Sequence, residues 1–496
     1  MILIKGAEII DGSGKPAARG DILIQDEKIS AIGNFPNKSA DVIIDGLGYQ
    51  LTPGFIDVNT DSDHYLSLFT NPPQKDFLLQ GVTTIIGGNC GSSLAPLLYG
   101  SLESIRKWTN INQVNVDWHT MAEFFKVLGR APIGVNFGTL VGHSTIRRAI
   151  LGEEIRDLSA NELEVFKKTL KQALEEGAFG LSSGLGYVHT RQTPYEEIKA
   201  LVEIVKAYDG VYATHLRNER ENLNAAVIET IKATRETGVR TIISHFRPLI
   251  GYEEGYQESL KLLDEISDLD IHFDFYPFDM SVIPLYTMLP LWAQTKNLEV
   301  MVENLKNSDL KAKILAEVPP PQPDDIVVSY AEGANYLAGK TIGQLAENYA
   351  FNTHEALVSL MLLTKLKAVI FYRNINLEMV LQAMANPRAL ISSNAASIIE
   401  SKQMIKHERF YSTFPKFLEI ILGNKSMPLE AAIQKITSTP AQIMNLKQRG
   451  LVKEGYFADL VMLKDGKVSN VFINGKLAVR DGQAQNILAG KILKRS

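Results

Sequence analysis

The sequence predicts an α/β protein: a (β/α)8 TIM-like barrel, with a small β-sandwich domain built from both termini and a helical insertion before the last barrel strand. Three observations support this fold. The middle of the chain alternates strand and helix patterns at about thirty residues per unit, which is typical of parallel strands joined by right-handed crossovers. Eight strand candidates can be counted. Both ends consist instead of short strands with Asp-Gly turns.

The two ends of the chain share one pattern. The first segment contains ILIKGAEIIDG, DILIQDEKISAIG and DVIIDGLG, in which apolar and polar residues roughly alternate. The last segment contains ADLVMLKDGKV and SNVFINGKLAVRDG. We therefore expect residues 1–52 and 445–496 to form one composite β-sandwich domain and residues 53–444 to form the barrel.

Local signals place the elements of the barrel. A capping box of Ser159 and Glu162 starts a helix that Gly177 ends, and Thr193-Pro194 starts the next. The gap before the last strand exceeds what one helix needs. It predicts an inserted helical segment at about 285–370, interrupted by PPPQP. The strand candidates are residues 55–59, 83–88, 134–142, 179–183, 211–215, 241–245, 271–277 and 389–394.

Composition excludes several classes of protein. The chain has 45% hydrophobic and 22% charged residues, as in an ordinary globular protein. A net charge of -5 gives no electrostatic footprint for nucleic acid, and no apolar run approaches the roughly 18 residues of a membrane helix. The N-terminus is too short and too charged for a signal peptide. A single cysteine fits a reducing cytosol, so a cytoplasmic location is expected.

Polar residues at the strand ends suggest a metal site. Barrel enzymes work at the C-terminal ends of their strands. His215 and His245 end neighbouring strand candidates, and Cys90 follows the second strand. One thiolate and two imidazoles suit zinc, with a fourth position left for water. The alternative for each residue singly is a small buried hydrophobe or a hydrogen-bonded rim residue.

The stretch GFIDVNTDSDH after the first strand is unusual for such a site. Strand side chains alternate, so Asp57, Asn59 and Asp61 point the same way. A hydrolase that binds metal at this mouth would usually carry histidines at the last two positions. This chain has an amide and a carboxylate instead.

Longer motifs carry a family resemblance over nearly the whole chain. The sequence resembles the amidohydrolase superfamily, specifically its N-acyl-D-amino-acid deacylase (D-aminoacylase) branch. This resemblance implies a metal-dependent barrel that hydrolyses the amide bond of an N-acyl amino acid, a small-molecule substrate with a carboxylate. The motifs are LTPGFIDV, GVTTIIGGNCGSSLAP, VGHSTIR, EGAFGLSSGLGY, ATHLRNE, ISHFRP, HERFYSTFPKFL and ITSTPAQIMNLKQRGLVKEGYFADLVML.

The resemblance also implies roles for individual residues. Cys90, His215 and His245 match the tightly held zinc ligands of the family, so one tightly bound zinc ion is expected. Arginine grips carboxylates at two points, and a second group of residues matches contacts to the substrate carboxylate. This group is Arg247, where the family has lysine, with Tyr276, Ser281 and Arg409.

Two family motifs are altered. The His-x-His motif becomes Asn59-x-Asp61, which removes two ligands for a second metal. The strand-eight aspartate becomes Asn394, in ISSNAA. In the family that aspartate is the general base, which takes a proton from the attacking water and passes it to the leaving nitrogen. A neutral amide cannot hold a proton at pH 7, and such catalysis is typically worth about 10² to 10⁴ in rate.

Three accounts of these changes remain open. The base has moved, a carboxylate and an amide oxygen at Asp61 and Asn59 bind a harder second ion, or hydrolysis is lost and the pocket binds a ligand or partner. A different reaction, such as opening a cyclic amide, is a further alternative. Our prediction is a zinc amidohydrolase with a rearranged base, in which Asn394 still orients water. Oligomeric state is left open. The candidates for the base are Asp61, Asp63 and His64, with Asp57, His143 and His189 behind them.

Overall fold

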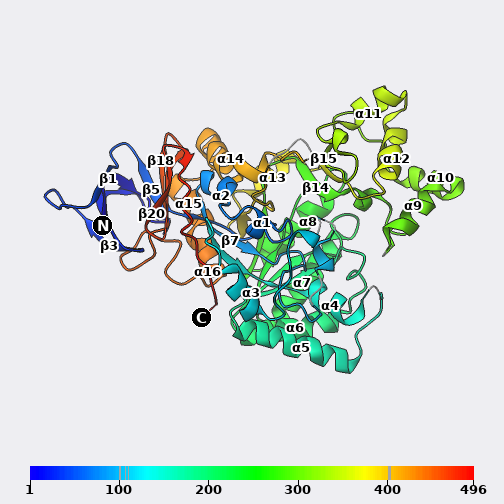
Figure 1. Ribbon diagram of the computed structural model, residues 1–496, viewed down its shortest axis with the longest axis horizontal. Coiled ribbons are helices and arrows are strands. Elements are labelled where there is room, and N and C mark those ends of the chain that lie inside the picture. The colour runs from blue at the N-terminus through cyan, green and yellow to red at the C-terminus, as the bar shows by residue number, and fades with distance from the viewer. Residues whose placement is uncertain are drawn as a thin grey trace.

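The computed structural model describes residues 1–99, 102–106, 108–109, 111–152, 154–295, 297–399 and 404–495. Along the long axis of the molecule lie a sheet formed by both chain ends, a central barrel, and an outer segment of helices and strands (Figure 1). In the part of the chain that is described, no helix is both long enough and apolar enough to cross a membrane.

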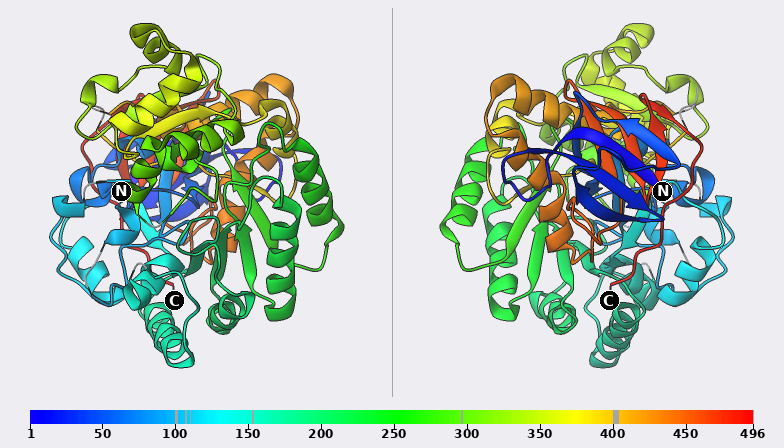
Figure 2. Two further views of the ribbon diagram at one scale, coloured as in Figure 1. Left: turned by 90° about the vertical axis from the view of Figure 1, so that its right-hand side faces the viewer. Right: turned by 90° about the vertical axis from the view of Figure 1, so that its left-hand side faces the viewer.

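Strands from both ends of the chain join in one nine-stranded sheet with its own apolar core. The two ends meet where β5 and β18 pair antiparallel, with Pro53 opposite Leu460. Figure 2 shows the blue N-terminal strands beside the red C-terminal ones. The domain boundaries at residues 52 and 445 stay a prediction. The strands are β1 (Ile2–Ile9), β2 (Ala18–Gln25), β3 (Lys28–Gly33), β4 (Val42–Asp45), β5 (Gln50–Pro53), β18 (Leu460–Lys464), β19 (Lys467–Ile473), β20 (Lys476–Arg480) and β21 (Gln483–Ala484).

Parallel strands form the barrel wall in two sheets, ordered β6-β7-β8 and β17-β13-β12-β11-β10-β9. Leu140 alone separates β8 from β9, and a bridge between Thr60 and Ala395 links the opposite ends of the two sheets. The expected strand at 134–142 is therefore two short strands. The α/β barrel fold predicted from the sequence is confirmed. The strands are β6 (Phe55–Asp57), β7 (Val82–Gly87), β8 (Asn136–Thr139), β9 (Val141–Gly142), β10 (Gly180–Gly184), β11 (Val211–His215), β12 (Arg240–Ile243), β13 (Ile271–Phe275) and β17 (Ala389–Ile391).

Helices pack outside these strands (Figure 2). The capping box at Ser159 and Glu162 is present, and Gly238 ends α7 in the left-handed conformation, with φ 69°. The helices are α1 (Ser67–Thr70), α2 (Lys75–Leu79), α3 (Met121–Leu128), α4 (His143–Leu151), α5 (Ala160–Glu175), α6 (Tyr195–Ala207), α7 (Leu223–Thr237), α8 (Glu253–Glu265), α13 (Leu377–Ala383), α14 (Arg409–Asn424), α15 (Leu429–Ile436) and α16 (Ser438–Ile443), with 3-10 turns η1 (Glu103–Ile105) and η2 (Ile111–Gln113).

The inserted segment contains strands as well as the expected helices. β14 and β16 pair antiparallel, so the chain leaves and re-enters the barrel at one place. Residues of both strands pack with Tyr65 and Phe410 at the barrel mouth, which places Ser281 of β14 beside the site described below. The elements are β14 (Met280–Pro284), η3 (Leu285–Met288), α9 (Leu298–Lys306), α10 (Ser308–Glu317), β15 (Ile326–Tyr330), η4 (Asn335–Leu337), α11 (Ile342–Tyr349), α12 (Thr353–Leu363) and β16 (Val369–Arg373).

Candidate active site

Three potential metal ligands converge at the C-terminal ends of the barrel strands. His215 ends β11, His245 follows β12, and Cys90 follows β7. Cys90 Sγ lies 3.3 Å from His245 Nε2, which in turn lies 2.8 Å from His215 Nδ1. Among the described residues, these three form the group of His, Cys, Asp and Glu ligand atoms that lie within 4.8 Å of one another.

The donor set fits a tetrahedral zinc ion. Bond lengths of about 2.3 Å to sulfur and about 2.0–2.1 Å to nitrogen would separate sulfur from nitrogen by about 3.6 Å and the two nitrogens by about 3.3 Å. The observed separations of 3.3 and 2.8 Å are shorter by about half an ångström or less. Small outward movements of the side chains would therefore admit the ion, and three protein ligands would leave one position open.

Three site residues adopt the left-handed backbone conformation although none is glycine. Their φ angles are 52° at Cys90, 38° at His245 and 44° at Asn394. Such conformations cost about 1–3 kcal/mol for residues other than glycine and persist where surrounding structure enforces them. The structure around the ends of β7, β12 and β17 thus holds Cys90, His245 and Asn394 in these conformations.

Glu219 joins this cluster, and the sequence interpretation missed it. Its carboxylate accepts a hydrogen bond from His245 Nδ1 at 3.0 Å and lies 3.9 Å from His215 Nε2. Arg247 donates to the same carboxylate through Nη2, at 3.0 and 3.2 Å. Burial alone would raise the pKa of Glu219, but Arg247 and the two histidines hold it well below its usual value. The ATHLRNE motif contains this residue, but spacing did not reveal its contacts.

The predicted carboxylate-binding residues lie together. Arg247 Nη1 donates to Tyr276 Oη at 3.1 Å and to Ser281 Oγ at 3.0 Å. The Arg409 guanidinium lies over the Tyr276 ring, 4.7 Å from its centroid. Burial would raise the pKa of Tyr276, but the two arginines hold it below its usual value. Tyr276 thus contacts both cations.

Arg409 is buried with donors to spare. Its relative exposure is 2%. Within the described part of the chain, Arg409 Nε and Nη1 and also Arg247 Nε are buried without a hydrogen-bond partner. An unsatisfied buried donor costs about 1–3 kcal/mol, and more when it is charged. Three such donors on two arginines that share Tyr276 fit an anionic ligand between them.

The strand-one residues Asp57 and Asn59 make structural contacts. Asp57 accepts from the Ser393 backbone N–H at 3.1 Å, and burial raises its pKa to about 8. Asn59 Nδ2 donates to both oxygens of Asp274, at 3.2 and 3.3 Å. Asp274, which the sequence interpretation also missed, accepts from the His245 backbone N–H and from Ser392. An aspartate inside the apolar run IHFDF was the available signal.

Asp61 and His64 are buried, and hydrogen bonds connect them with the partly buried Asn394. Asp61 Oδ1 lies 2.9 Å from His64 Nδ1, and Asn394 Nδ2 donates to Asp61 Oδ2 at 3.2 Å. His64 Nε2 lies 3.1 Å from the Ser92 carbonyl. Both partners of His64 only accept, so both ring nitrogens carry protons. Burial opposes this charge, but Asp63 and Asp61 raise the pKa of His64 to about 10. A cationic imidazole cannot act as a base.

Asp61 stays ionised in this setting. Burial would raise its pKa, but the hydrogen bond and charge of His64, with Arg409 and His245, hold the pKa below its usual value. The Asp61 side chain therefore carries a negative charge at neutral pH, at the point where the strand-one and strand-eight loops meet.

Two of the other proposed bases make contacts away from the Cys90–His215–His245 cluster. Asp63 accepts from the Gly88 backbone N–H at 2.6 Å and from the His64 backbone N–H at 3.0 Å. His143 begins α4, where its Nε2 lies 2.8 Å from Glu197 Oε1 and its ring stacks on Phe166. These contacts place both residues in loop and helix packing, and a catalytic role for either stays a prediction.

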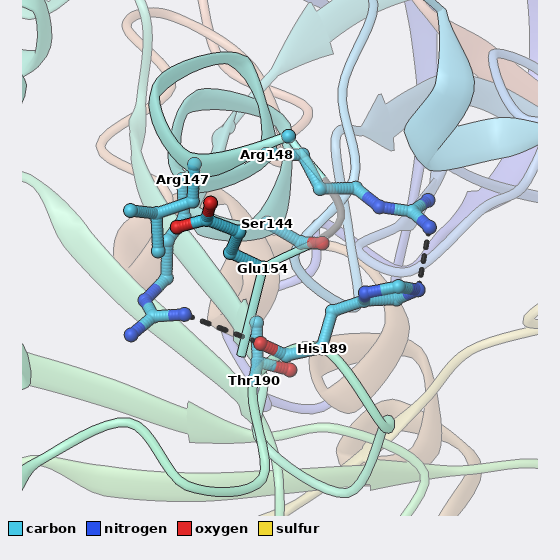
Figure 3. Close-up of a pocket in the computed structure, with 8 residues that line it drawn as sticks. Ser144, Arg147, Arg148, Glu154, His189 and Thr190 are labelled. Carbon is cyan, nitrogen blue, oxygen red and sulfur yellow. Dashed lines mark hydrogen bonds between the residues drawn. The ribbon is translucent and has the colours of Figure 1, made fainter. Parts of the chain in front are cut away.

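His189 lines a separate, shallow hollow (Figure 3). Its Nε2 lies 2.5 Å from Arg148 Nη2, and its backbone carbonyl accepts from Arg147 Nη1 at 3.2 Å. Ser144, Glu154 and Thr190 line the same hollow. His189 is thus held by two arginines of α4 and is not part of the cluster of three ligands.

Comparisons with known proteins agree with this architecture. The family described as "Amidohydrolase family" matches residues 382–478. D-aminoacylase of Alcaligenes xylosoxydans xylosoxydans is 27% identical over 518 residues, which cover 100% of this chain and 98% of that protein. N-acyl-D-aspartate deacylase of the same organism is 27% identical over 484 residues, covering 94% and 86%.

Solved structures give the same result. N-acyl-D-glutamate deacylase of Bordetella bronchiseptica, complexed with zinc and a phosphonate inhibitor, has a TM-score of 0.82 at 23% identity and covers 99% of both chains, which shows the fold. A crystal structure of D-aminoacylase has a TM-score of 0.82 at 25% identity, covering 100% and 99%. Fold and sequence thus support a protein that resembles the amidohydrolases. Among them its likeness is to the D-aminoacylases, as its motifs predict.

Replacing Cys90 by serine should strip or greatly weaken bound zinc, because a serine hydroxyl is a poor substitute for thiolate. The metal content of purified protein, measured by atomic spectroscopy, checks this. Asn89→Ser on the neighbouring position is the control, since Asn89 Nδ2 donates to backbone carbonyls instead. Equal zinc content in Cys90→Ser and wild type would contradict the ligand assignment.

Proposed function

We propose that the protein is a zinc-dependent amidohydrolase that cleaves the amide bond of an N-acyl amino acid, with the D series first among the candidates. One observation carries this proposal. Arg409 presents buried guanidinium donors that lack partners among the described residues, beside Tyr276 and Arg247. A substrate carboxylate would accept from these donors in a charge-assisted pair. Three relatives are deacylases of D-amino-acid derivatives by name.

The carboxylate-binding residues lie next to the potential metal ligands. Arg247 reaches Glu219, and Glu219 reaches His245. A carboxylate held by Arg247, Tyr276, Ser281 and Arg409 therefore lies one side chain away from the zinc ligands. An amide adjacent to that carboxylate would reach the open position of the metal site. Bound zinc would polarise the amide carbonyl and make water nucleophilic near neutral pH.

Asp61 is the proposed proton carrier. The water oxygen bonds to the carbonyl carbon while Asp61 accepts the proton that water loses. Asp61 then gives this proton to the nitrogen as the carbon–nitrogen bond breaks, which regenerates the carboxylate. Its ionised state and its position 3.2 Å from Asn394 support this assignment. The cationic His64 holds the carboxylate in place, and Asn394 orients it.

A single metal is part of the proposal, and a second ion is not. Asp61 accepts one hydrogen bond on each oxygen, from His64 and Asn394, and its remaining lone pairs are assigned to the attacking water. Asn59 Nδ2 faces Asp274. Neither side chain supplies the imidazole nitrogen that the altered His-x-His motif has lost. The proposed partner is a small molecule, and the proposed location is the cytosol.

The test is zinc content together with hydrolysis of a panel of N-acetyl-D- and N-acetyl-L-amino acids. We expect close to one zinc per chain and turnover of members of the D series, lost on treatment with a chelator and restored by zinc. Zinc-loaded protein that hydrolyses no member of the panel would contradict the proposal and favour a non-catalytic binding protein. The methyl esters of the same N-acetyl amino acids are the matched control, because they lack the free carboxylate.

A further inference from the structure

Glu219 connects the three potential metal ligands with the predicted carboxylate-binding residues. It stands four residues after His215, in the loop that follows β11. One of its oxygens lies 3.0 Å from His245 Nδ1. Both of its oxygens accept from Arg247 Nη2, at 3.2 and 3.0 Å. A single carboxylate therefore contacts a metal ligand and a carboxylate-binding arginine at once.

We propose that Glu219 is a positioning residue that couples zinc binding to recognition of the substrate carboxylate. This inference rests on the proposed function and adds a link between its two halves. Zinc held by His245 and a carboxylate held by Arg247 both depend on one orientation of the Glu219 side chain. Any effect that one ligand has on the affinity for the other must be reciprocal.

The contact to His245 sets the tautomer of this ligand. A carboxylate only accepts, so the proton stays on His245 Nδ1 and the Nε2 lone pair is left for the metal. Nε2 is the atom that faces Cys90 Sγ and His215 Nδ1, at 3.3 and 2.8 Å. Loss of such a partner typically weakens metal binding about 10- to 100-fold.

The contact to Arg247 sets the direction of the guanidinium. With Nη2 held by Glu219, Nη1 reaches Tyr276 and Ser281. Ser281 donates in turn to Asn374 Oδ1 at 2.7 Å, which anchors this end in the inserted sheet. Without the Glu219 carboxylate, the guanidinium group of Arg247 loses the charge that fixes its direction. The substrate carboxylate then loses a pre-oriented hydrogen-bond donor.

The chain offers a matched control. Glu229 on α7 pairs with Arg217 through two hydrogen bonds, at 2.7 and 2.9 Å. Arg217 lies two residues after His215, as Arg247 lies two residues after His245. Glu229 is also a carboxylate paired with an arginine, but it is not part of the group formed by Cys90, His215 and His245 among the described residues. Glu229→Gln therefore removes a similar ion pair without touching the proposed link.

The experiment compares Glu219→Gln and Glu229→Gln in two measurements. Zinc affinity of metal-free protein is measured by competition with a chromogenic chelator, and kinetics are measured at saturating zinc with N-acetyl-D-alanine. For Glu219→Gln we expect zinc affinity to fall about 10- to 100-fold. At saturating zinc, KM should rise about tenfold, more than kcat falls, because uniform binding is lost. Glu229→Gln should match wild type in both measurements.

The outcomes separate the two proposals. Wild-type affinity for zinc in Glu219→Gln, or loss of zinc affinity without a rise in KM, would overturn the coupling alone. Equal effects of Glu229→Gln would show that removing any nearby ion pair disturbs the site, which also overturns it. Wild-type protein that binds no zinc would overturn the proposed function, and the coupling with it.

Discussion

Replacing Arg409 by methionine should lower kcat/KM for an N-acyl amino acid by about 10² to 10³, while the protein becomes no less stable. The loss corresponds to about 3–4 kcal/mol at 1.36 kcal/mol per tenfold, as expected when a buried carboxylate loses charge-assisted hydrogen bonds. The free energy of unfolding should not fall with it. Arg409 is 2% exposed, and its Nε and Nη1 lack partners among the described residues. An apolar side chain of similar length removes that cost, though it also forfeits the contact with Tyr276.

A loss of activity without a loss of stability distinguishes a ligand-binding arginine from a structural one. Arg388→Met is the control, because Arg388 Nη1 donates to the carbonyls of Leu269 and Ile271 at 3.1 and 2.8 Å. This control should lower the midpoint of chemical denaturation and leave KM unchanged. Kinetics and denaturation of both variants check the prediction. Lower stability with unchanged kcat/KM in Arg409→Met would assign that residue a structural role.

Strand counting was enough to predict the three potential metal ligands. His215 and His245 lie one strand–helix unit apart, so parallel neighbours bring them to the same height, and Cys90 follows another strand. In the structure their ligand atoms lie within 4.8 Å of one another. Repeat length fixes such positions because every strand of a barrel delivers its last residue to one rim. Their role as zinc ligands stays a prediction.

Contacts within loops could not be predicted in the same way. Glu219 follows β11 in an irregular segment, where spacing does not determine direction. The charge state of His64 depends on two acceptors, one of which, Ser92, is 28 residues further along the chain. The strands β14 and β16 pair across about ninety residues, which local patterns do not reveal. The helical insertion predicted before the last barrel strand therefore contains strands as well as helices, and its predicted bounds stay a prediction.

The contact between Asp61 and Asn394 bears on which residue is the general base. Asp61 and Asn394 face each other across one hydrogen bond of 3.2 Å, so this chain has a carboxylate on strand one and an amide on strand eight. The family resemblance places the carboxylate on strand eight. We infer that the proton carrier has moved from position 394 to position 61. Activity should then require one carboxylate in this pair, whichever of the two strands carries it.

Asp61→Asn should therefore lower kcat by about 10² to 10⁴, the usual value of general acid–base catalysis. Zinc content should not change, because Cys90, His215 and His245 are intact. Asp76→Asn is the control: Asp76, on α2, is paired with Lys406 at 2.9 Å and accepts from Ser397, instead of from His64 and Asn394. Wild-type kcat in Asp61→Asn would exclude this residue as the proton carrier.

Asn394→Asp alone should act on pH dependence. It places a second carboxylate where an amide now lies 3.2 Å from Asp61, and two such groups cannot both ionise at ordinary pH. The pair then shares one proton, with its upper apparent pKa raised. In wild type, activity is lost only as pH falls through the depressed pKa of Asp61. In Asn394→Asp, the singly protonated pair still has one ionised carboxylate, so the acidic limb of the kcat/KM profile should stay at low pH. The raised upper pKa should add a second inflection at higher pH, which the same profile checks.

The double variant Asp61→Asn with Asn394→Asp should recover activity to within about tenfold of wild type, because it restores one carboxylate and one amide with their places exchanged. His64 still has an oxygen to donate to at position 61. Recovery in the double variant, combined with loss in Asp61→Asn, would show strongly non-additive effects, which is the expected sign of two residues that share one function. A double variant as slow as Asp61→Asn would mean that a carboxylate on strand eight no longer reaches the reacting atoms, and that the strand-one position of the base has become a fixed property of this site.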